Sequence, residues 1–390
     1  MNVGLFSSRA PASRGSLRGT LPMLPIVILA VIAVLLASMP PSLSRNQPAG
    51  TLKDASGHSI ALVPPARRIV MFPPVLWDYL ALGADAKRLA AVSKLVRDSV
   101  TGSMLHATYP AIAALSTVVT RGAGTALPAD VEDVMRHDPD AVLSWDALSD
   151  NLTNLDLPVV KLLLNAKTRG NEPHTADIAN LRVMGNLTGE QRTAEEMVGT
   201  YLAAVERVSR RADEARAAAG RPPRAMFLSV RGGGQLYLEA PPFLQGKALQ
   251  MAGADTKDFL PAGNFSAEQL LIWDPDVIVL DCCYGNHTPP AFFYDDPRFA
   301  GMSAVRNRRI YVAPAGVARM ENMLEWPLLV SWLAEVLYPE HMAHTVRSDL
   351  AQLYVEHYGF RPTPLELDSM LATAENAASR DYALVGGAGH

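Results

Sequence analysis

Short apolar runs alternate with amphipathic segments along most of the chain between residues 51 and 340. Runs of four to seven residues that are rich in β-branched side chains predict buried strands, and segments with apolar positions at helical spacing predict helices. In the first half, strands are expected at 67–72, 88–93 and 157–163, with a helix, a turn and a strand over 127–145. Strands that alternate with helices are typical of parallel sheets covered on both faces.

The same alternation returns in the second half. Strands are expected at 224–230 and 309–314, with helices at 243–254 and 326–339. The segment VEDVMRHDPDAVLSW (131–145) also matches AEQLLIWDPDVIVLD (267–281), each with an acid, apolar positions, Asp-Pro-Asp and an apolar strand. The repeat predicts an α/β protein of two similar lobes, each with a central parallel sheet.

Residues 176–219 carry no strand pattern and are rich in Ala, Glu and Arg from Thr188 onwards. With Thr188 as a candidate N-cap and Gly220 as the stop, a helix of about thirty residues is predicted, about 45 Å long. A single helix of this length suits a rigid connection between the lobes. The expected parts are 51–175 as N-terminal lobe, 176–220 as connecting helix region, 221–340 as C-terminal lobe, and 341–390 as a C-terminal helix with a loosely attached tail.

The N-terminus differs from the rest of the chain. Residues 1–20 hold three arginines and no acid, and an uninterrupted apolar run follows at 26–37. This layout predicts that 1–44 is an export signal, or an N-terminal anchor if it is not cleaved. Loss of 1–44 would change the formal net charge from −4 to −7. A negative chain without Lys/Arg-rich runs is not expected to bind nucleic acid.

Seven segments, in order, resemble the periplasmic solute-binding proteins of ABC importers for iron–siderophore complexes, cobalamin and haem. They include LWDYLALGADAKRLAAVS, KALQMAGADTKDF, FSAEQLLIWDPDVIVL and DDPRFAGMSAVRNRRIYVAP, and the resemblance runs from Thr51 to Glu340. It implies two lobes joined by one rigid helix, with a ligand cleft between them. It further implies a periplasmic monomer that captures a ligand and delivers it to a permease dimer, without catalysis, a cofactor or a metal site of its own.

The resemblance also implies a docking role for two acids. The family carries an exposed glutamate on each lobe that pairs with permease arginines, and by position these are Glu132 and Glu268. The simpler interpretation is that each is a favourable acid in the first turn of a helix.

Candidate ligand contacts follow from the rule that ligands of open α/β sheets lie outside the carboxyl ends of the strands. Aromatic faces and arginines at these loops suit a large, flat or anionic chelate. Core packing is the alternative for each tryptophan. The candidates are Phe72, Trp77, Arg97, Trp145, Arg231, Tyr284, His287 and Arg319.

The two cysteines of the chain, Cys282 and Cys283, are adjacent and follow a predicted strand. A vicinal disulfide is one interpretation, although neighbouring Cα atoms about 3.8 Å apart make its ring strained. Structural zinc, a nucleophile with His287 as base, a ligand-facing lining and an ordinary loop are the others. Tyr284 and His287 are better candidates for ligand contact than the cysteines.

The identity of the ligand stays open at this level. A ferric siderophore is the leading hypothesis, followed by a corrinoid, haem and a bare metal or small metal chelate, and the ligand is expected to contain iron or cobalt. Two rival functions remain, an exported enzyme that uses cysteine and histidine in the cleft, and a partner-binding protein without a transport role.

Overall fold

A computed structural model describes residues 50–101, 109–119, 130–146, 152, 157–164, 174–241, 243–256, 262–282, 288–317 and 319–387. The predicted export segment 1–44 and two candidate contacts, Tyr284 and His287, lie outside the described residues. Within the described ranges, no helix combines the length and the apolar character needed to cross a membrane.

The N-terminal lobe is built on a five-stranded parallel sheet of order β5-β4-β3-β6-β7. The central strand β3 is buried along its whole length, since both faces of the sheet are covered. The strands are β3 (Ile69–Met71), β4 (Leu89–Ser93), β5 (Thr117–Val118), β6 (Ala141–Trp145) and β7 (Val159–Leu162), preceded by the antiparallel pair β1 (Thr51–Lys53) and β2 (Ser59–Ala61). The helices are α2 (Leu76–Ala81), α3 (Lys94–Thr101) and α5 (Val131–Arg136).

The C-terminal lobe has a second five-stranded sheet of order β10-β9-β8-β11-β12. Its strands β8 (Ala225–Arg231), β11 (Val277–Leu280) and β12 (Ile310–Val312) are parallel, whereas β9 (Gln235–Leu238) and β10 (Gly263–Phe265) are antiparallel to their neighbours. The antiparallel turn depends on glycine, because Gly233 and Gly234 between β8 and β9 have φ of 74° and 78°. The helices are α8 (Leu244–Met251), α9 (Ala267–Trp273), α10 (Ala291–Tyr294) and α11 (Ser303–Arg306).

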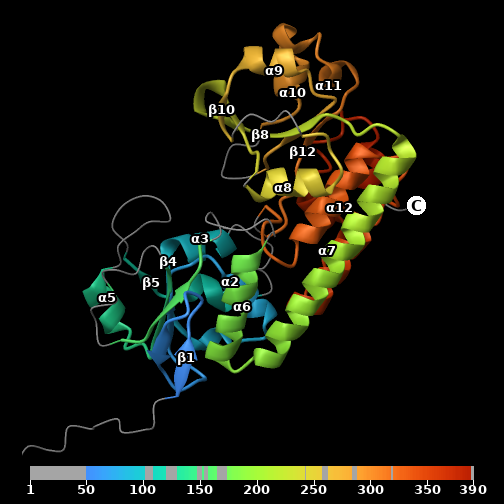
Figure 1. Ribbon diagram of the computed structural model, residues 1–390. Coiled ribbons are helices and arrows are strands. Elements are labelled where there is room, and N and C mark those ends of the chain that lie inside the picture. The colour runs from blue at the N-terminus through green and yellow to red at the C-terminus, as the bar shows by residue number, and fades with distance from the viewer. Residues whose placement is uncertain are drawn as a thin grey trace, which may run out of the picture. The chain divides into compact units, whose positions relative to one another are not determined.

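A single long helix links the lobes, and a shorter helix that packs against the N-terminal lobe precedes it. The shorter helix, α6 (Thr175–Thr188), ends at Gly189, which has φ of 85°, and α7 (Gln191–Ala219) follows with 29 residues. The long connecting helix is confirmed, but the expectation that it starts at Thr188 is wrong. The Thr188 hydroxyl donates to the carbonyl oxygen of Met184 (2.8 Å) and so belongs to the last turn of α6. In Figure 1 α7 runs beside α12 (Trp326–Leu337), against which it packs.

The C-terminal segment is packed, so the expectation of a loosely attached tail is wrong for residues up to 387. It contains α13 (Val346–Tyr358), α14 (Pro364–Met370) and α15 (Tyr382–Val385). The buried Asn376 side chain accepts from the N–H of Val312 (2.7 Å) and donates to its carbonyl oxygen (2.9 Å). A side-chain amide therefore satisfies the hydrogen-bonding groups of the β12 backbone at Val312. In the same segment, the Tyr382 hydroxyl accepts a hydrogen bond from the Trp332 indole N–H (3.1 Å).

The repeat seen in the sequence is also a structural repeat. Asp138, which follows the C-cap of α5, and Asp274, the C-cap of α9, both adopt the left-handed region, with φ of 44° and 43°. In each lobe an arginine guanidinium fixes this turn: Arg68 donates to the Asp138 carbonyl oxygen (2.9 Å) and Arg224 to the Asp274 carbonyl oxygen (2.6 Å).

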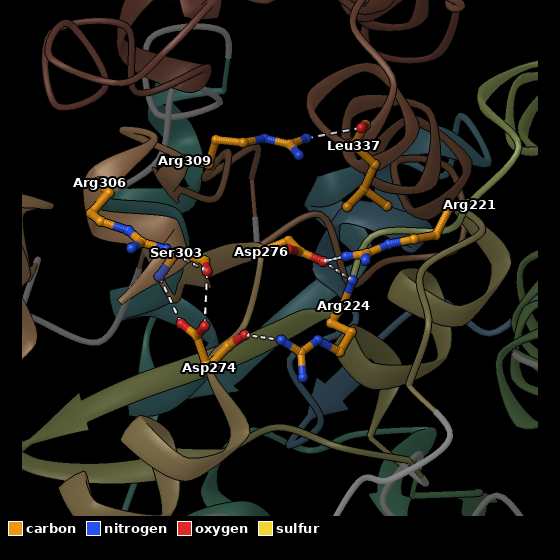
Figure 2. A network of polar contacts seen from close by, with 8 residues as sticks. All are labelled: Arg221, Arg224, Asp274, Asp276, Ser303, Arg306, Arg309 and Leu337. Carbon is orange, nitrogen blue, oxygen red and sulfur yellow. Dashed lines mark hydrogen bonds and ion pairs between the residues drawn. The ribbon is translucent and has the colours of Figure 1, made fainter. Parts of the chain in front are cut away.

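The second aspartate of each Asp-Pro-Asp turn has a shared role as well. Asp140 accepts from the backbone N–H of Arg68 (2.9 Å), and Asp276 accepts from the backbone N–H of Arg224 (2.9 Å). In the C-terminal lobe Arg221 adds an ion pair to Asp276 (2.8 Å), as Figure 2 shows. Because these carboxylates hold the entry of β3 and β8, the turn between helix and strand is tied to the central strand of its sheet.

Candidate functional site

The side chains at the carboxyl ends of the parallel strands form the candidate site. In the N-terminal lobe Phe72 directly follows β3 and is half-buried. Its N–H donates to the Leu143 carbonyl oxygen (3.0 Å), and its carbonyl oxygen accepts from the Ser93 hydroxyl (2.9 Å). The backbone of Phe72 is therefore fixed by both neighbouring strands, while part of its ring stays exposed.

The two tryptophan candidates of this lobe are core residues. Trp77 is 4% exposed and Trp145 is 7% exposed, and both belong to the main hydrophobic core. Trp145 is buried because β6 is an inner strand whose two faces are both covered. Core packing is thus the better interpretation of both rings. Arg97 lies on α3 and is half-buried.

Arg231, at the end of β8, is exposed and lies over an aromatic ring. Its guanidinium carbon is 3.4 Å from the centroid of Tyr237, which meets Phe243 edge-on at 6.3 Å. Phe243 is 37% exposed. Arg231, Tyr237 and Phe243 form a cation–aromatic shelf on the C-terminal lobe. Sequence reasoning missed the two rings, although Tyr237 stands at an alternating position of a predicted strand.

Arg319, after β12, is already paired within the chain. Its guanidinium contacts Asp281 (3.0 Å) and Glu321 (3.3 Å), and its side chain is 14% exposed. The expectation of an arginine that awaits an anionic ligand therefore needs correction, because two carboxylates balance its charge. Asp281 directly follows β11, which pairs with β12 ahead of the loop that carries Arg319.

Burial raises the pKa of Asp281 above its usual range, against the lowering effect of Arg319. Burial likewise raises the pKa of Glu321. The nearby carboxylate of Glu239 also raises the pKa of both Asp281 and Glu321. Glu239 accepts a hydrogen bond from the Ser229 hydroxyl (2.6 Å). Among the described residues, no His, Cys, Asp and Glu side chains are grouped so as to hold a metal ion.

The loop that carries Arg319 has a strained backbone. Arg319 and Met320 both adopt the left-handed region, with φ of 59° and 51°. The loop is held by the buried carboxylate of Glu325, which accepts from the Val317 N–H (3.0 Å). Gly316, with φ of 53°, passes so close that an added Cβ would lie 2.6 Å from Glu325 Oε2.

Cys282 is 1% exposed and disulfide-bonded, and its Sγ lies 3.4 Å from the Pro314 carbonyl oxygen. The one other cysteine of the sequence, Cys283, lies outside the described residues. A buried sulfur in a disulfide is not a nucleophile.

A family profile described as periplasmic binding protein matches residues 74–316. The chain belongs to the periplasmic binding protein family. This membership makes it a solute-binding protein and not an enzyme. The earlier resemblance, the two-lobed α/β fold and the absence of a catalytic role are thereby confirmed. No curated protein matches the sequence significantly.

Solved structures share the fold of this periplasmic binding protein at low sequence identity. A periplasmic solute-binding protein from Veillonella parvula is 20% identical, with a TM-score of 0.71 over 84% of this chain and 98% of that one. MolA from Haemophilus influenzae, bound to molybdate, is 15% identical, with a TM-score of 0.61 over 80% and 99%. CeuE from Helicobacter pylori, with Ni(II) bound, is 13% identical, with a TM-score of 0.60 over 84% and 98%.

The two predicted docking acids lie at matching positions of the binding protein. Glu132 is in the first turn of α5 and Glu268 in the first turn of α9, and both are exposed. The pKa of Glu268 is lowered, mainly by a hydrogen bond from its own backbone N–H and then by Ser266. Its carboxylate therefore stays ionised at neutral pH.

A second group of acids is buried away from the strand ends. Burial, with the carboxylates of Asp177 and Glu325 nearby, raises the pKa of Asp78 to about 8. Asp177 Oδ2 lies at hydrogen-bond distance, 2.5 Å, from His174 Nδ1. Within the described residues, Asp78 Oδ1 and His174 Nε2 are buried and have no hydrogen-bond partner.

The raised pKa of Asp78 predicts a stability that falls with pH. The folded state holds a proton that the unfolded state releases near pH 4, so stability decreases as pH rises from about 4 to about 8. The decrease is at most about 1.4 kcal/mol per pH unit. In Asp78→Asn this decrease is absent. Between pH 5 and pH 8 the melting temperature of the variant should therefore rise by several degrees relative to that of the parent chain. Parallel melting curves for the two chains would contradict the assignment, and the exposed Glu206→Gln is the control.

The close approach of Gly316 to Glu325 predicts a large cost for a methyl group. Gly316→Ala should lower the free energy of unfolding by about 2–4 kcal/mol, since it combines a left-handed alanine with overpacking. Gly57→Ala is the matched control, because Gly57 has φ of 86° but no atom within 4 Å of an added Cβ. It should lose about 1–2 kcal/mol. Urea unfolding measures both, and equal losses would show that Glu325 does not constrain the loop.

Proposed function

We propose that this periplasmic binding protein captures a metal chelate and delivers it to the permease dimer of its ABC importer. A ferric siderophore is the leading ligand, and a corrinoid or haem is the next. The chain would leave the cytoplasm through the segment 1–44 and act as a monomer, joined to the membrane only if that segment is not cleaved. A partner-binding role without transport is the alternative.

The observation that carries this proposal is the shelf of Arg231, Tyr237 and Phe243 at the strand ends of the C-terminal lobe. Rings and an arginine offer broad apolar area together with a planar fork for carboxylate or catecholate oxygens. Phe72 and Arg97, at the strand ends of the other lobe, supply further half-exposed contacts. The set therefore suits a large ligand better than a bare ion.

Arg319 enters the proposal in a changed role. With Asp281 and Glu321 around it, the arginine supports the wall of the site and offers hydrogen-bond donors rather than uncompensated positive charge. Tyr284 and His287 stay candidate contacts from the sequence. Structures of the same fold are described with molybdate and with Ni(II), so small oxyanions and metal ions belong in any test of the ligand.

The exposed glutamates Glu132 and Glu268 are proposed to pair with basic groups of the permease. Support comes from their equivalent places on the two lobes, which suit a partner with two like subunits.

A thermal-shift panel tests the ligand. It contains ferric catecholate, hydroxamate and carboxylate siderophores, haemin, cyanocobalamin, molybdate and Ni(II). One chelate should raise the melting temperature by several degrees, since a ligand at a hundred times its Kd stabilises by about 2.7 kcal/mol.

In Arg231→Ala the affinity for that chelate should fall about tenfold or more, because a charge-assisted contact is lost. Arg210→Ala, exposed on α7, is the control and should bind as the parent chain does. A panel with no stabilising chelate, or one in which only Ni(II) or molybdate stabilises, would contradict capture of a large chelate.

A further inference from the structure

An exposed apolar side chain accompanies the exposed acid on each of the two matching helices. On α5, Glu132 is followed three residues later by Met135, which is 50% exposed. On α9, Glu268 is followed three residues later by Leu271, which is 39% exposed. Side chains three positions apart share one face of a helix, so each lobe presents an acid and an apolar group side by side.

The internal repeat separates positions that serve the fold from positions that do not. Val134 and Leu270 match each other and are both fully buried, so the fold requires them. The Asp-Pro-Asp turns match because both aspartates hold backbone groups. The exposed acid and the exposed apolar side chain are shared as well.

Neither packing nor hydrogen bonding within the described chain explains the apolar member of the pair. An acid in the first turn stabilises a helix, but an exposed Met or Leu does not. One exposed apolar side chain is ordinary on a protein surface. Here an exposed apolar side chain stands beside an exposed glutamate on both lobes, although the helices differ at other positions, such as Asp133 and Gln269. This repetition indicates a contact with an external partner.

The two copies of the pair are unequal in apolar area. Ile272, next to Leu271, is 84% exposed, the highest fraction among the large apolar side chains that the structure describes. The matching position of the other lobe holds Arg136, which pairs with Asp133 (3.1 Å). The C-terminal half of the surface is thus the more apolar one.

We propose that Glu132 with Met135, and Glu268 with Leu271 and Ile272, form a two-part docking surface for the two membrane subunits of the importer. The inference rests on the proposed function and adds an apolar component to the acidic one. Each membrane subunit would present a basic side chain beside an apolar hollow. The C-terminal half carries the larger part of the affinity, because it buries two large side chains against one.

Charge argues against a second copy of this chain as the occupant. A symmetric contact through this face would bring two copies of the same acidic surface together, and like charges brought close oppose association. Arg298 is the cation that acts on the charge of Glu268, and its guanidinium is paired with Asp296 (2.6 Å). The acid is therefore available to a basic partner.

Crosslinking identifies the occupant. A benzophenone amino acid is placed at position 135, 271 or 272 of the full chain, expressed in its own host and irradiated. Positions 202 and 365 are matched controls, since Leu202 on α7 is 53% exposed and Leu365 on α14 is 77% exposed. Peptide mass spectrometry should identify a membrane subunit of an ABC importer from the three test positions and not from the controls. Crosslinks to a second copy, to soluble proteins, or equally from the controls would overturn the proposal, as would no crosslink.

Affinity for that importer complex, reconstituted in lipid nanodiscs, separates the two components. Leu271→Ser and Ile272→Ser should each weaken binding about tenfold or more, and Met135→Ser less than either. Glu268→Gln should weaken binding at low salt and flatten its salt dependence, which Leu271→Ser should leave unchanged. Leu202→Ser should bind as the parent chain does.

The ligand-binding readout distinguishes the two levels of failure. If the serine variants bind the importer normally and all chains bind the stabilising chelate, the apolar surface is wrong and the proposed function stands. If the parent chain binds no chelate and no importer, the proposed function itself fails.

Discussion

The buried carboxylate of Glu325 is the constraint on which the wall of the candidate site depends. It is fully buried and accepts hydrogen bonds from the Val317 N–H (3.0 Å), the Asn322 amide (2.6 Å) and the Tyr354 hydroxyl (2.6 Å). Burial of a charged group is tolerated where hydrogen bonds replace its hydration. These donors come from the loop after β12, the approach to α12, and α13. One carboxylate thus joins three separate segments, and two of its donors, Val317 and Asn322, flank the strained residues Arg319 and Met320 in the chain.

This arrangement suits recognition rather than catalysis. A strained loop held by a buried hydrogen-bonded acid presents a fixed surface, and fixed surfaces bind with little loss of conformational entropy. Arg319 is balanced by Asp281 and Glu321, and the buried Cys282 is disulfide-bonded. In both lobes the turn between helix and strand is fixed in the same way, because hydrogen bonds tie an Asp-Pro-Asp turn to the start of the central strand.

Features that depend on neighbouring residues could be predicted from the sequence. The β-branched runs gave correct strands, because a strand buried on both faces requires apolar side chains throughout. The repeat of Glu132 and Glu268 predicted matching helices, since the same spacing of buried and capping residues encodes the same turn. The long helix was found from composition, but its start was misplaced because Thr188 is the last residue of the preceding helix, which Gly189 caps.

Features that depend on distant contacts could not be predicted. The pairing of Arg319 with Asp281 joins residues 38 positions apart, and the bond from Asn376 to Val312 spans 64. No local pattern encodes either contact, so the arginine resembled an anion site and the C-terminal segment resembled a tail. Trp145 followed a strand as a ligand-stacking ring would, and its burial became evident only from the order of the sheet.

The most direct test of capture without chemistry is the absorption spectrum and native mass of the protein purified from its own host. Capture predicts a bound metal chelate, visible as a Soret, corrin or charge-transfer band, that is released on unfolding with its mass unchanged. Protein from chelate-replete cells that carries no chromophore, or that releases a cleaved ligand, would contradict the proposed function.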